Sequence, residues 1–587
     1  MANWVVMAKK ADFNRLAEKF NISPMVARII RNRDMIEEKE IEKFLYGTLE
    51  DLYPPEQMKD MVKGAEIVKD KIREKQKIRI IGDYDIDGVC ATYILRKGLL
   101  ICGAQVDFAI PHRIYDGYGL NEHLIQQAYE DGIDTIITCD NGIAACEQIE
   151  KAKELGMTVL ITDHHEIPFS EGQNGEKKYQ IPPAVAVIDP RQEDCPYPYK
   201  EICGAVVAYK FIQCLMTKMG VETHLLNELL EFAAIATVGD VMPLLDENRI
   251  IVKYGLAAIR KTKNIGLKAL LTVNGLEEKD LSPYHIGYVL GPCLNATGRL
   301  DTAARALDLF DTEEPADAAV IAGDLKALND SRKDMTAKGV ELAIDQLEHT
   351  GHKNDTVLVV YLPECHESLA GIIAGRIREK YGKPTFIFTD GEEGVKGSGR
   401  SIEAYHMYEA LSRHKELFTK FGGHKMAAGL SLISNNVETF RHCMNADSNL
   451  TPKDFQEKIQ IDIPMPMRFA NLDFINELSL LEPFGTGNAK PIFAQKNVHF
   501  LSGRILGKNR NVGKYVVEDE QQNRFDVIYF GDIQAFDAYI SEQYGLEQKH
   551  SLYEGKKTKI SLSICYYPDI NEYRGMKNIQ IVMKDFQ

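Results

Sequence analysis

The residues best suited to chemistry stand in one short stretch that follows a β-branched run. Asp83, Asp85 and Asp87 occupy alternate positions after Ile78–Ile81, a run typical of a buried strand. Carboxylates this close repel one another unless cations lie among them, and oxygen ligands suit hard divalent metals. The stretch therefore predicts a metal site at the end of a strand. A solvated acidic turn is the alternative; a calcium loop is disfavoured because a strand precedes the acids and no Glu follows at the right distance.

Acids or histidines also follow the next strands that the sequence predicts. Apolar runs at 105–110, 134–138, 157–162 and 184–188 alternate with helical segments, the pattern of a doubly wound parallel sheet. Ligands of such sheets bind beyond the carboxyl ends of the strands. The polar residues at those ends are, in order, His112 and Arg113, then Asp140 and Asn141, then Asp163, His164 and His165, and then Asp189. Each Asp could be a helix N-cap, but together they predict one cleft.

Asp240 extends this set from outside the sheet. It follows the apolar helical segment 225–237, where it could cap the next turn or complete the metal cage. Carboxylates with one or two imidazoles bind Mn²⁺ or Mg²⁺, and the histidines favour Mn²⁺. Two ions that share a carboxylate activate a water and neutralise a phosphate. The sequence shows no Gly-x-Ser-x-Gly or Cys/His signature of a protein nucleophile, so it predicts metal-dependent phosphodiester cleavage.

Length and composition limit the number of domains and the class of protein. The 587 residues are 44% hydrophobic, and a prior of ~150 residues per domain gives three or four domains. The net charge of −16 argues against indiscriminate coating of nucleic acid, although it allows a local basic channel. No apolar run reaches the ~20 residues that cross a bilayer, and the first residues are too short an apolar stretch for a signal peptide. Eleven cysteines without a Cys-x-x-Cys pair indicate a reducing cytoplasm.

The periodicity divides the chain into five parts. We expect an α/β protein with an N-terminal helical region (1–70), a doubly wound metal-binding domain (71–300), a helical connector (301–350), a second α/β domain (351–451) and a C-terminal β barrel (452–587). The barrel suggests an oligonucleotide-binding (OB) fold, because period-two runs alternate with Gly and Asn turns. Tyr566, Tyr567 and Tyr573 are candidates to stack on bases, although aromatic core positions are the more common alternative.

Three Gly-rich segments are suited to anion binding. We expect loops at 291–301, 396–401 and 421–429, which carry Arg299, Arg400 and His424 respectively. Basic residues crowd the window 376–425, but taken alone this cluster is better explained as an ordinary solvated surface of helices and loops.

At this point the chain resembles a known family. Gly82–Gly88, Asp140–Gly142, Asp163–His165 and Gly239–Asp240 are similar to the four motifs of the DHH phosphoesterase superfamily. Further segments resemble the RecJ family of single-strand-specific 5′-to-3′ DNA exonucleases: Leu294–Arg299, Gly397–Ser401, Phe421–His424 and Pro483–Asn488. The resemblance runs from about residue 46 to near the C-terminus, and the order and combination of the motifs are specific.

The resemblance implies a role for each matching residue. Two ions, Mn²⁺ or Mg²⁺, would be held by Asp85, Asp87, Asp140, His164 and Asp240, with Asp140 bridging them and Asp83 in or beside their coordination shell. His165 would act on the scissile phosphate, and Asp163 would orient its neighbours. The DNA and its 5′ phosphate would be held by Arg113, Asn295, Arg299, Ser398, Arg400 and His424.

The leading hypothesis is a two-metal exonuclease that degrades single-stranded DNA with a 5′ phosphate to mononucleotides during repair and recombination. A single-strand-binding protein and a helicase are the partners to expect, the protein is expected to be a monomer, and no membrane is involved. A second hypothesis keeps the metal site but gives it short oligonucleotides, cyclic dinucleotides or pyrophosphate, which would not need the C-terminal barrel. A third hypothesis, a non-catalytic scaffold, is disfavoured because every candidate ligand is present.

Overall fold

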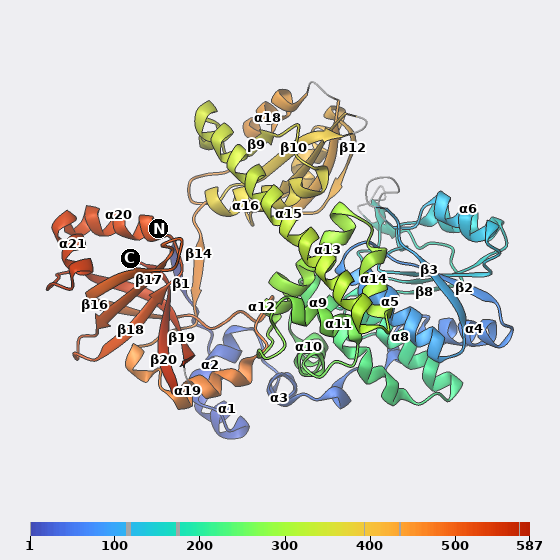
Figure 1. Cartoon of the computed structure of the whole chain (residues 1–587), viewed down its shortest axis with the longest axis horizontal. Coiled ribbons are helices and arrows are strands. Elements are labelled where there is room, and N and C mark those ends of the chain that lie inside the picture. Colours follow the sequence, from blue (N-terminus) through green and yellow to red (C-terminus); the bar gives the residue numbers. More distant parts are fainter. Residues whose placement is uncertain (1, 113–118, 172–175, 392–393, 434–435, 574–575) are drawn as a thin grey trace. The chain divides into compact units, whose positions relative to one another are not determined.

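The structure is a computed structural model that describes all residues except 1, 113–118, 172–175, 392–393, 434–435 and 574–575 (Figure 1). Contacts divide the chain into two units, one made of residues 1–48 and 456–587, the other of residues 49–455. The five-part division expected from the sequence remains a prediction. Among the helices described, none combines the length and the apolar character needed to cross a bilayer.

The candidate site belongs to a five-stranded, wholly parallel sheet in the second unit, which confirms the predicted doubly wound architecture (Figure 1). In spatial order its strands are β3 (Gln105–Ala109), β2 (Lys77–Ile81), β4 (Thr135–Cys139), β5 (Thr158–Thr162) and β8 (Ala186–Ile188). Strands β2, β4 and β5 are short β-branched runs buried on both faces, as parallel strands between helix layers must be. A two-stranded hairpin, β6 (Phe169–Glu171) and β7 (Lys177–Tyr179), follows β5.

Helices cover both faces of this sheet. One face packs against α4 (Met61–Arg73), α5 (Ile86–Ile101) and α8 (Gly204–Met219). The other packs against α6 (Glu122–Glu130) and α7 (Cys146–Glu154). Helix α5 is buried along most of its length, and Gly98 lets it approach α8 so closely that a Cβ there would lie 2.4 Å from Ile212. The helix that starts at the carboxylate stretch is therefore held rigidly in the core.

A helical layer completes this part of the unit. It contains α9 (Leu230–Gly239), α10 (Asp246–Ile259), α11 (Ile265–Val273), α12 (Pro283–His285), the π-helical turn η4 (Ile286–Leu290), α13 (Gly291–Leu300), α14 (Ala304–Asp311) and α15 (Pro315–Thr350). The loop predicted at 291–301 is wrong, because most of it forms α13. Its glycines serve close packing: a Cβ on Gly291 would lie 3.1 Å from Ile86, and one on Gly298 would lie 2.3 Å from the carbonyl oxygen of Tyr84.

The second sheet of this unit is mixed. Its strands run in the order β12 (Phe418–Gly423), β13 (Ala427–Leu432), β11 (Gly394–Arg400), β10 (Thr385–Gly391) and β9 (Leu358–Tyr361). Helices α16 (Glu367–Tyr381), α17 (Met407–Ser412) and α18 (Val437–Ala446) accompany it. The loop predicted at 396–401 is wrong as well, since β11 pairs with both β10 and β13. Gly397 and Gly399 leave room there for Phe388 and Phe386, so the glycines mark a packed strand.

The first unit contains the predicted barrel. Strands β16 (Phe493–Leu506), β17 (Val512–Glu518), β18 (Arg524–Tyr529), β20 (Met576–Phe586) and β19 (Ser561–Tyr573) form a sheet that closes through the pairing of β16 with β19. The helices α19 (Leu472–Leu478), α20 (Ile533–Tyr544) and α21 (Leu546–Glu554) were not anticipated. Tyr566 is fully buried and donates to the carbonyl of Met465, so it is a core residue and no stacking candidate. Tyr567 is half-buried, and the side chain of Tyr573 lies outside the described residues.

We expected the N-terminal segment of this unit to be helical, but it begins with a strand. Strand β1 (Asn3–Val6) pairs in parallel with β14 (Lys458–Ile461), and a short strand β15 (Ile463–Pro464) joins the barrel sheet at β16. Helices α1 (Phe13–Phe20), α2 (Pro24–Asn32) and α3 (Glu38–Tyr46) follow β1. Strand β1 could not be predicted from the local sequence pattern, because the strand it pairs with lies more than 450 residues later in the chain.

Candidate metal centre and active site

Backbone donors orient the acids of the turn between β2 and α5. Asp85 is the N-cap of α5, and its Oδ1 accepts two N–H groups of the first helical turn, each at 3.0 Å. The Asp87 carboxylate accepts the N–H groups of Gly204 at 2.6 Å and Ala205 at 2.8 Å, where α8 begins. Asp83 and Asp87 are both 1% exposed. The helix N-termini thus compensate part of the negative charge that the sequence concentrates here.

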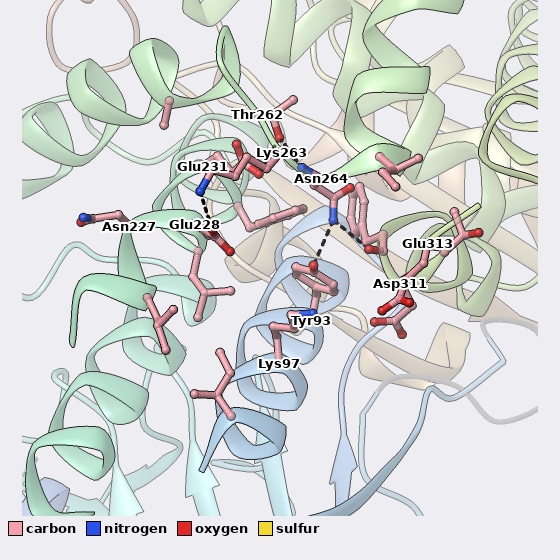
Figure 2. A pocket seen from close by; sticks show the side chains of 18 of the residues that line it. Tyr93, Lys97, Asn227, Glu228, Glu231, Thr262, Lys263, Asn264, Asp311 and Glu313 are labelled. Carbon is pink, nitrogen blue, oxygen red and sulfur yellow. Dashed lines mark hydrogen bonds and ion pairs between the residues drawn. The ribbon is translucent and has the colours of Figure 1, made fainter. Parts of the chain in front are cut away.

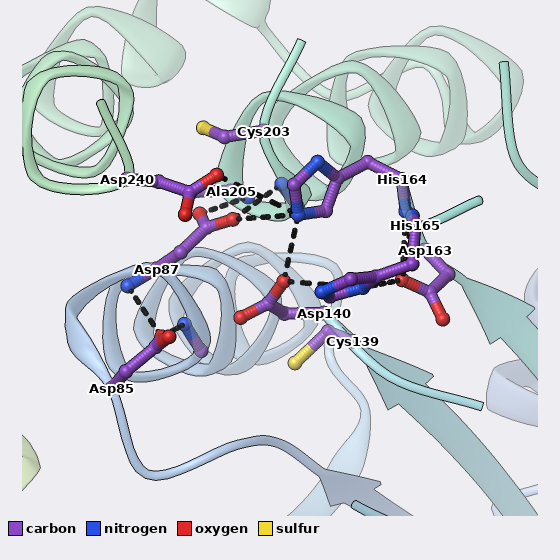
Figure 3. Close-up of polar contacts among 12 residues, drawn as sticks. Asp85, Asp87, Cys139, Asp140, Asp163, His164, His165, Cys203, Ala205 and Asp240 are labelled. Atoms are coloured by element: carbon purple, nitrogen blue, oxygen red, sulfur yellow. Dashed lines mark hydrogen bonds and ion pairs between the residues drawn. The ribbon is translucent and has the colours of Figure 1, made fainter. Parts of the chain in front are cut away.

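The other predicted ligands converge on the same point from three further elements (Figure 3). Asp140 follows β4 in a left-handed conformation, with φ +59°. His164 follows β5, and Asp240 caps the end of α9. The Nε2 atom of His164 lies 3.1 Å from Asp140 Oδ1, 3.4 Å from Asp87 Oδ2 and 3.8 Å from Asp240 Oδ2. Parallel strand ends and one helix end therefore deliver their polar side chains to a common point, as the topology predicts.

The ligand atoms form three overlapping groups, each with atoms within 4.8 Å of one another: Asp83, Asp85 and Asp140; Asp140, His164 and His165; and Asp87, His164 and Asp240. Asp140 belongs to two of these groups and His164 to two. Donors for more than one ion thus lie side by side around shared side chains. Carboxylate oxygens with imidazole nitrogens are a donor set that fits Mn²⁺ or Mg²⁺.

The electrostatics of the cluster point the same way. Burial, and then the neighbouring carboxylates Asp87 and Asp85, raise the pKa of Asp140 well above its ordinary value. The same causes raise the pKa of Asp240 to about 8. A buried set of mutually repelling carboxylates is costly, and a divalent cation among them removes both the repulsion and the uncompensated charge. The residues present therefore fit the metals that the sequence predicts.

Asp163 and His165 form a hydrogen-bonded pair at the edge of the cluster, where His165 also belongs to one of the ligand groups (Figure 3). His165 Nδ1 lies 2.7 Å from Asp163 Oδ1, and the His165 side chain is 43% exposed. Burial lowers the pKa of His165, but the charge and hydrogen bond of Asp163 outweigh burial and raise it to about 9. Burial raises the pKa of Asp163, and His165 more than offsets this, so that the carboxyl stays ionised. The pair presents a cationic ring at the border of the metal cluster.

A cleft of about 1,010 Å³ opens beside His165 within the second unit. Tyr84 and His165 line it from the parallel sheet. From the mixed sheet it is lined by Lys396, Ser398, Lys420, Gly422, Gly423 and His424, among others. Cations, a hydroxyl and glycine backbone facing a histidine make a surface suited to phosphate oxygens.

The predicted phosphate-binding residues have different positions. Ser398 and His424 line the cleft. Arg400, two residues after Ser398 in β11, donates a hydrogen bond to the Ser398 hydroxyl oxygen at 3.4 Å. Asn295 Oδ1 instead accepts the backbone N–H of Ile86 at 2.9 Å, which supports the acidic turn. Arg299 donates to the carbonyl oxygen of Ser368 at 2.7 Å and so joins α13 to the start of α16. Arg113 lies outside the described residues.

Sequence reasoning missed several residues of the site. Lys396 and Lys420 line the cleft, whereas the sequence favoured a solvated surface for the basic window that contains them. The alternation along β11 could have found Lys396, since buried Val395, Gly397 and Gly399 alternate with residues on the open face. Arg191 was also missed: it donates to the carbonyl of His164 at 2.8 Å and pairs with Glu201 at 3.2 Å, which holds the loop after β5.

A second cavity, of about 350 Å³, lies among α5, α9, α11 and α14 (Figure 2). Glu231, Thr262 and Asn264 are among its lining residues. None of the predicted site residues lines this cavity. It is therefore distinct from the metal cluster.

Comparison with known proteins agrees with this geometry. The model of the DHH family, N-terminal domain, matches residues 77–237, the DHHA1 domain matches residues 354–447, and the RecJ OB domain matches residues 461–585. The single-stranded-DNA-specific exonuclease RecJ of Escherichia coli is 32% identical over 96% of this chain and 95% of its own length. The protein of that name from Bacillus subtilis is 34% identical over 97% of this chain and 69% of its own length.

Solved structures give the same answer for the fold. The crystal structure of RecJ in complex with Mn²⁺ from Thermus thermophilus superposes with a TM-score of 0.81 at 25% sequence identity. The match covers 100% of this chain and 79% of that one. Because three successive family models and relatives above 30% identity extend over nearly its whole length, the chain belongs to the RecJ family.

Proposed function

We propose that this chain is an exonuclease that degrades single-stranded DNA from the 5′ end to mononucleotides with two divalent ions, Mn²⁺ or Mg²⁺, in DNA repair and recombination. The observation that carries the proposal is the convergence of carboxylates and His164 around Asp140, at the border of a cleft lined by phosphate-binding groups. Relatives matched over almost their entire length are named single-stranded-DNA-specific exonucleases.

In this proposal the ligands are Asp85, Asp87, Asp140, His164 and Asp240, with Asp140 shared between the ions and Asp83 in or beside their shell. The overlap of the ligand groups at Asp140 supports that sharing. When bound, the ions supply positive charge to the scissile phosphate and an acidified water for in-line displacement. The protein groups fix the donors beforehand: backbone N–H groups hold Asp85 and Asp87, and Arg191 holds the carbonyl of His164.

His165 and Asp163 act next to the metals. The His165 ring borders the cleft, and its cationic form, stabilised by Asp163, faces the place where a phosphate would gain negative charge. A fixed cation there stabilises the charged transition state more than the ground state. Asp163 binds no ion in this proposal, since its oxygens already accept hydrogen bonds from His165 and from the backbone.

The 5′ polarity follows from where the strand end would bind. Ser398, Arg400 and His424 on the mixed sheet would hold the terminal phosphate, and Arg299, Asn295 and Arg113 would assist in holding the DNA. Arg400 and the cleft residue Ser398 lie next to Gly371 of α16. A Cβ added at Gly371 would lie 2.7 Å from the Arg400 guanidinium and 2.8 Å from the Ser398 hydroxyl oxygen. A strand end anchored there places the next phosphodiester toward Asp140. Preference for an unpaired strand is part of the proposal, and the relatives are named single-stranded-DNA-specific exonucleases.

The test uses purified protein, Mn²⁺ and a long 5′-phosphorylated strand that carries a fluorophore at its 3′ end. Progressive shortening from the 5′ end and release of mononucleotides are expected, with no attack on blunt duplex. Asp140→Ala should abolish cleavage while the protein still binds the strand in an anisotropy assay. Persistent cleavage by that variant would show that the metal assignment is wrong. Equal rates on a dinucleotide and on the long strand would favour the small-substrate alternative.

The setting of the enzyme is part of the proposal. A single-strand-binding protein and a helicase would supply its substrate, because it needs an unpaired 5′ end. We place the protein in the cytoplasm as a monomer. Sedimentation with and without a single-strand-binding protein would test both the monomer and that partner.

A further inference from the structure

Two tyrosine side chains stand exposed and stacked on the helical layer of the second unit. Tyr284 in α12 and Tyr288 in η4 are 61% and 69% exposed. Their ring centroids are 5.0 Å apart and their planes are inclined by only 24°. Between residues 186 and 319, all of which the structure describes, the only other exposed large hydrophobic side chain is Val241. Such rings contribute little to the core, and adjacent exposed aromatic rings form an apolar surface on which a partner can bind.

The backbone beneath these rings contacts the segment that carries Asp240. A Cβ added at Gly287 would lie 3.8 Å from the side chain of Val238, so the turn is in contact with this residue. Val238 is two residues before Asp240. Gly291, at the other end of the π-helical turn, faces Ile86 between Asp85 and Asp87. The turn that displays the tyrosines thus packs directly on two of the strand and helix ends that bring ligands to the metal cluster.

The backbone here departs from regular geometry at two places. The turn Ile286–Leu290 is π-helical. This conformation is rare in proteins overall, and where it occurs it is often at a functional site. Val241 has φ +60°, which is unusual for a β-branched residue, and its side chain is 66% exposed next to Asp240. Both irregular places carry an exposed side chain: Tyr288 in the π-helical turn and Val241 next to Asp240.

The cleft of Ser398, His424 and His165 lies at one side of the cluster, and Asp240 does not line it. On the proposed function, a strand whose 5′ end fills this cleft would cross the metal ligands and continue toward Asp240. We propose that Tyr284 and Tyr288 form a platform on which bases of the strand, on the 3′ side of the scissile phosphate, stack as the DNA leaves the metal cluster. This inference rests on the proposed function.

Stacking fits the chemistry of this surface. Every base offers a π face, so two adjacent aromatic rings hold unpaired DNA without regard to sequence. An exonuclease that removes one nucleotide after another needs this tolerance. A platform of this kind also selects unpaired DNA, because paired bases are already stacked in the duplex. A protein partner is the other occupant that exposed rings could accept, and the experiment separates the two.

The experiment measures binding of 5′-phosphorylated single-stranded DNA by fluorescence anisotropy in EDTA, where no cleavage occurs. The double variant Tyr284→Leu/Tyr288→Leu should bind at least roughly fivefold more weakly, the change expected for losing one stacked base. Tyr284→Trp and Tyr288→Trp should retain affinity, because a larger ring still stacks. Tyr129→Leu, on α6 and 49% exposed, is the matched control and should bind as the wild type does.

A scan of abasic positions along the strand makes the test specific. The wild type should lose affinity at one or two positions downstream of the first phosphodiester, and the double Leu variant should show no loss at those positions. Unchanged affinity of the double variant, or an identical abasic profile in both proteins, would overturn the platform and favour a protein partner. A wild-type chain that neither binds nor cleaves the strand would instead overturn the proposed function.

Discussion

His165 Nδ1 lies 2.7 Å from Asp163 Oδ1, and the same oxygen accepts the backbone N–H groups of His164 at 2.8 Å and His165 at 3.3 Å. The second oxygen of Asp163 accepts the N–H of Ile143 at 2.9 Å. One buried carboxylate therefore fixes both the loop after β5 and the ring that borders the cleft. Asp163 belongs to none of the three ligand groups around the cluster.

Replacing Asp163 by Asn should separate positioning from metal binding. An amide can keep only one of the two accepting oxygens, so a buried N–H would face the N–H of Ile143, at a cost of ~1–3 kcal/mol. We expect a lower melting temperature and a rate of DNA cleavage reduced about a hundredfold or more, as for loss of an oriented acid–base group. Calorimetric titration should still show Mn²⁺ binding, weakened by no more than about 10–100-fold, the loss typical of an outer-shell partner of the ligands. Loss of Mn²⁺ binding in a folded variant would identify Asp163 as a ligand.

Asp140→Asn should have opposite effects on stability and metal binding. Asn tolerates the left-handed conformation at this position, and it replaces a carboxyl whose ionisation is opposed by burial and by the neighbouring carboxylates. Without metal, the variant should melt roughly a few degrees higher than wild type. With Mn²⁺, the wild type should gain stability by linkage and the variant should not. Asp194→Asn, an exposed residue paired with Lys59, is the control that should keep the Mn²⁺-dependent gain.

The meeting of the acids could be predicted from sequence because parallel strands end at one edge. Once β2, β4 and β5 are recognised from their β-branched runs, Asp83, Asp140 and His164 must lie near one another. The pattern does not say what each side chain contacts. Asn295 of α13 accepts the backbone N–H of Ile86, because α13 packs against the acidic turn. No local sequence pattern predicts that packing.

The errors in the Gly-rich segments have one physical cause. Glycine favours loops by its local preference, but tertiary contacts decided its use here. Gly291 and Gly298 allow α13 to lie against the acidic turn, and Gly397 and Gly399 allow Phe388 and Phe386 to pack on β11. Sequence alone cannot distinguish a glycine needed for a turn from one needed for close approach.

Gly298→Ala tests this account of α13. A Cβ at this position would lie 2.3 Å from the carbonyl oxygen of Tyr84, which belongs to the acidic turn. We expect α13 to shift, the affinity for Mn²⁺ to fall about tenfold or more and the melting temperature to drop, since misplacing a site by a fraction of an ångström is costly. Gly323→Ala in α15 is the matched control, because nothing lies within 4 Å of its Cβ. It should be neutral or stabilising by about 0.5–1 kcal/mol. Equal effects of the two substitutions would contradict the packing role.

Glu231 gives a prediction for pH that does not involve the metal ligands. It is 4% exposed beside the second cavity, and its Oε1 accepts the hydroxyl of Thr262 at 2.8 Å (Figure 2). Burial raises its pKa from 4.5 to about 7. Between these two values the folded protein binds more protons than the unfolded chain, so the free energy of unfolding falls as pH rises, by up to about 3 kcal/mol.

Glu231→Gln removes this titration and retains an acceptor for Thr262. The free energy of unfolding of the variant, relative to wild type, should therefore increase as pH rises from about 4.5 to about 7 and then level off. Urea unfolding of the full chain at several pH values in this range measures the difference. Asn227→Ala, a change at a non-titrating residue of the same cavity, should shift stability by the same amount at every pH. A difference between Glu231→Gln and wild type that stays constant with pH would show that Glu231 is ionised throughout the range.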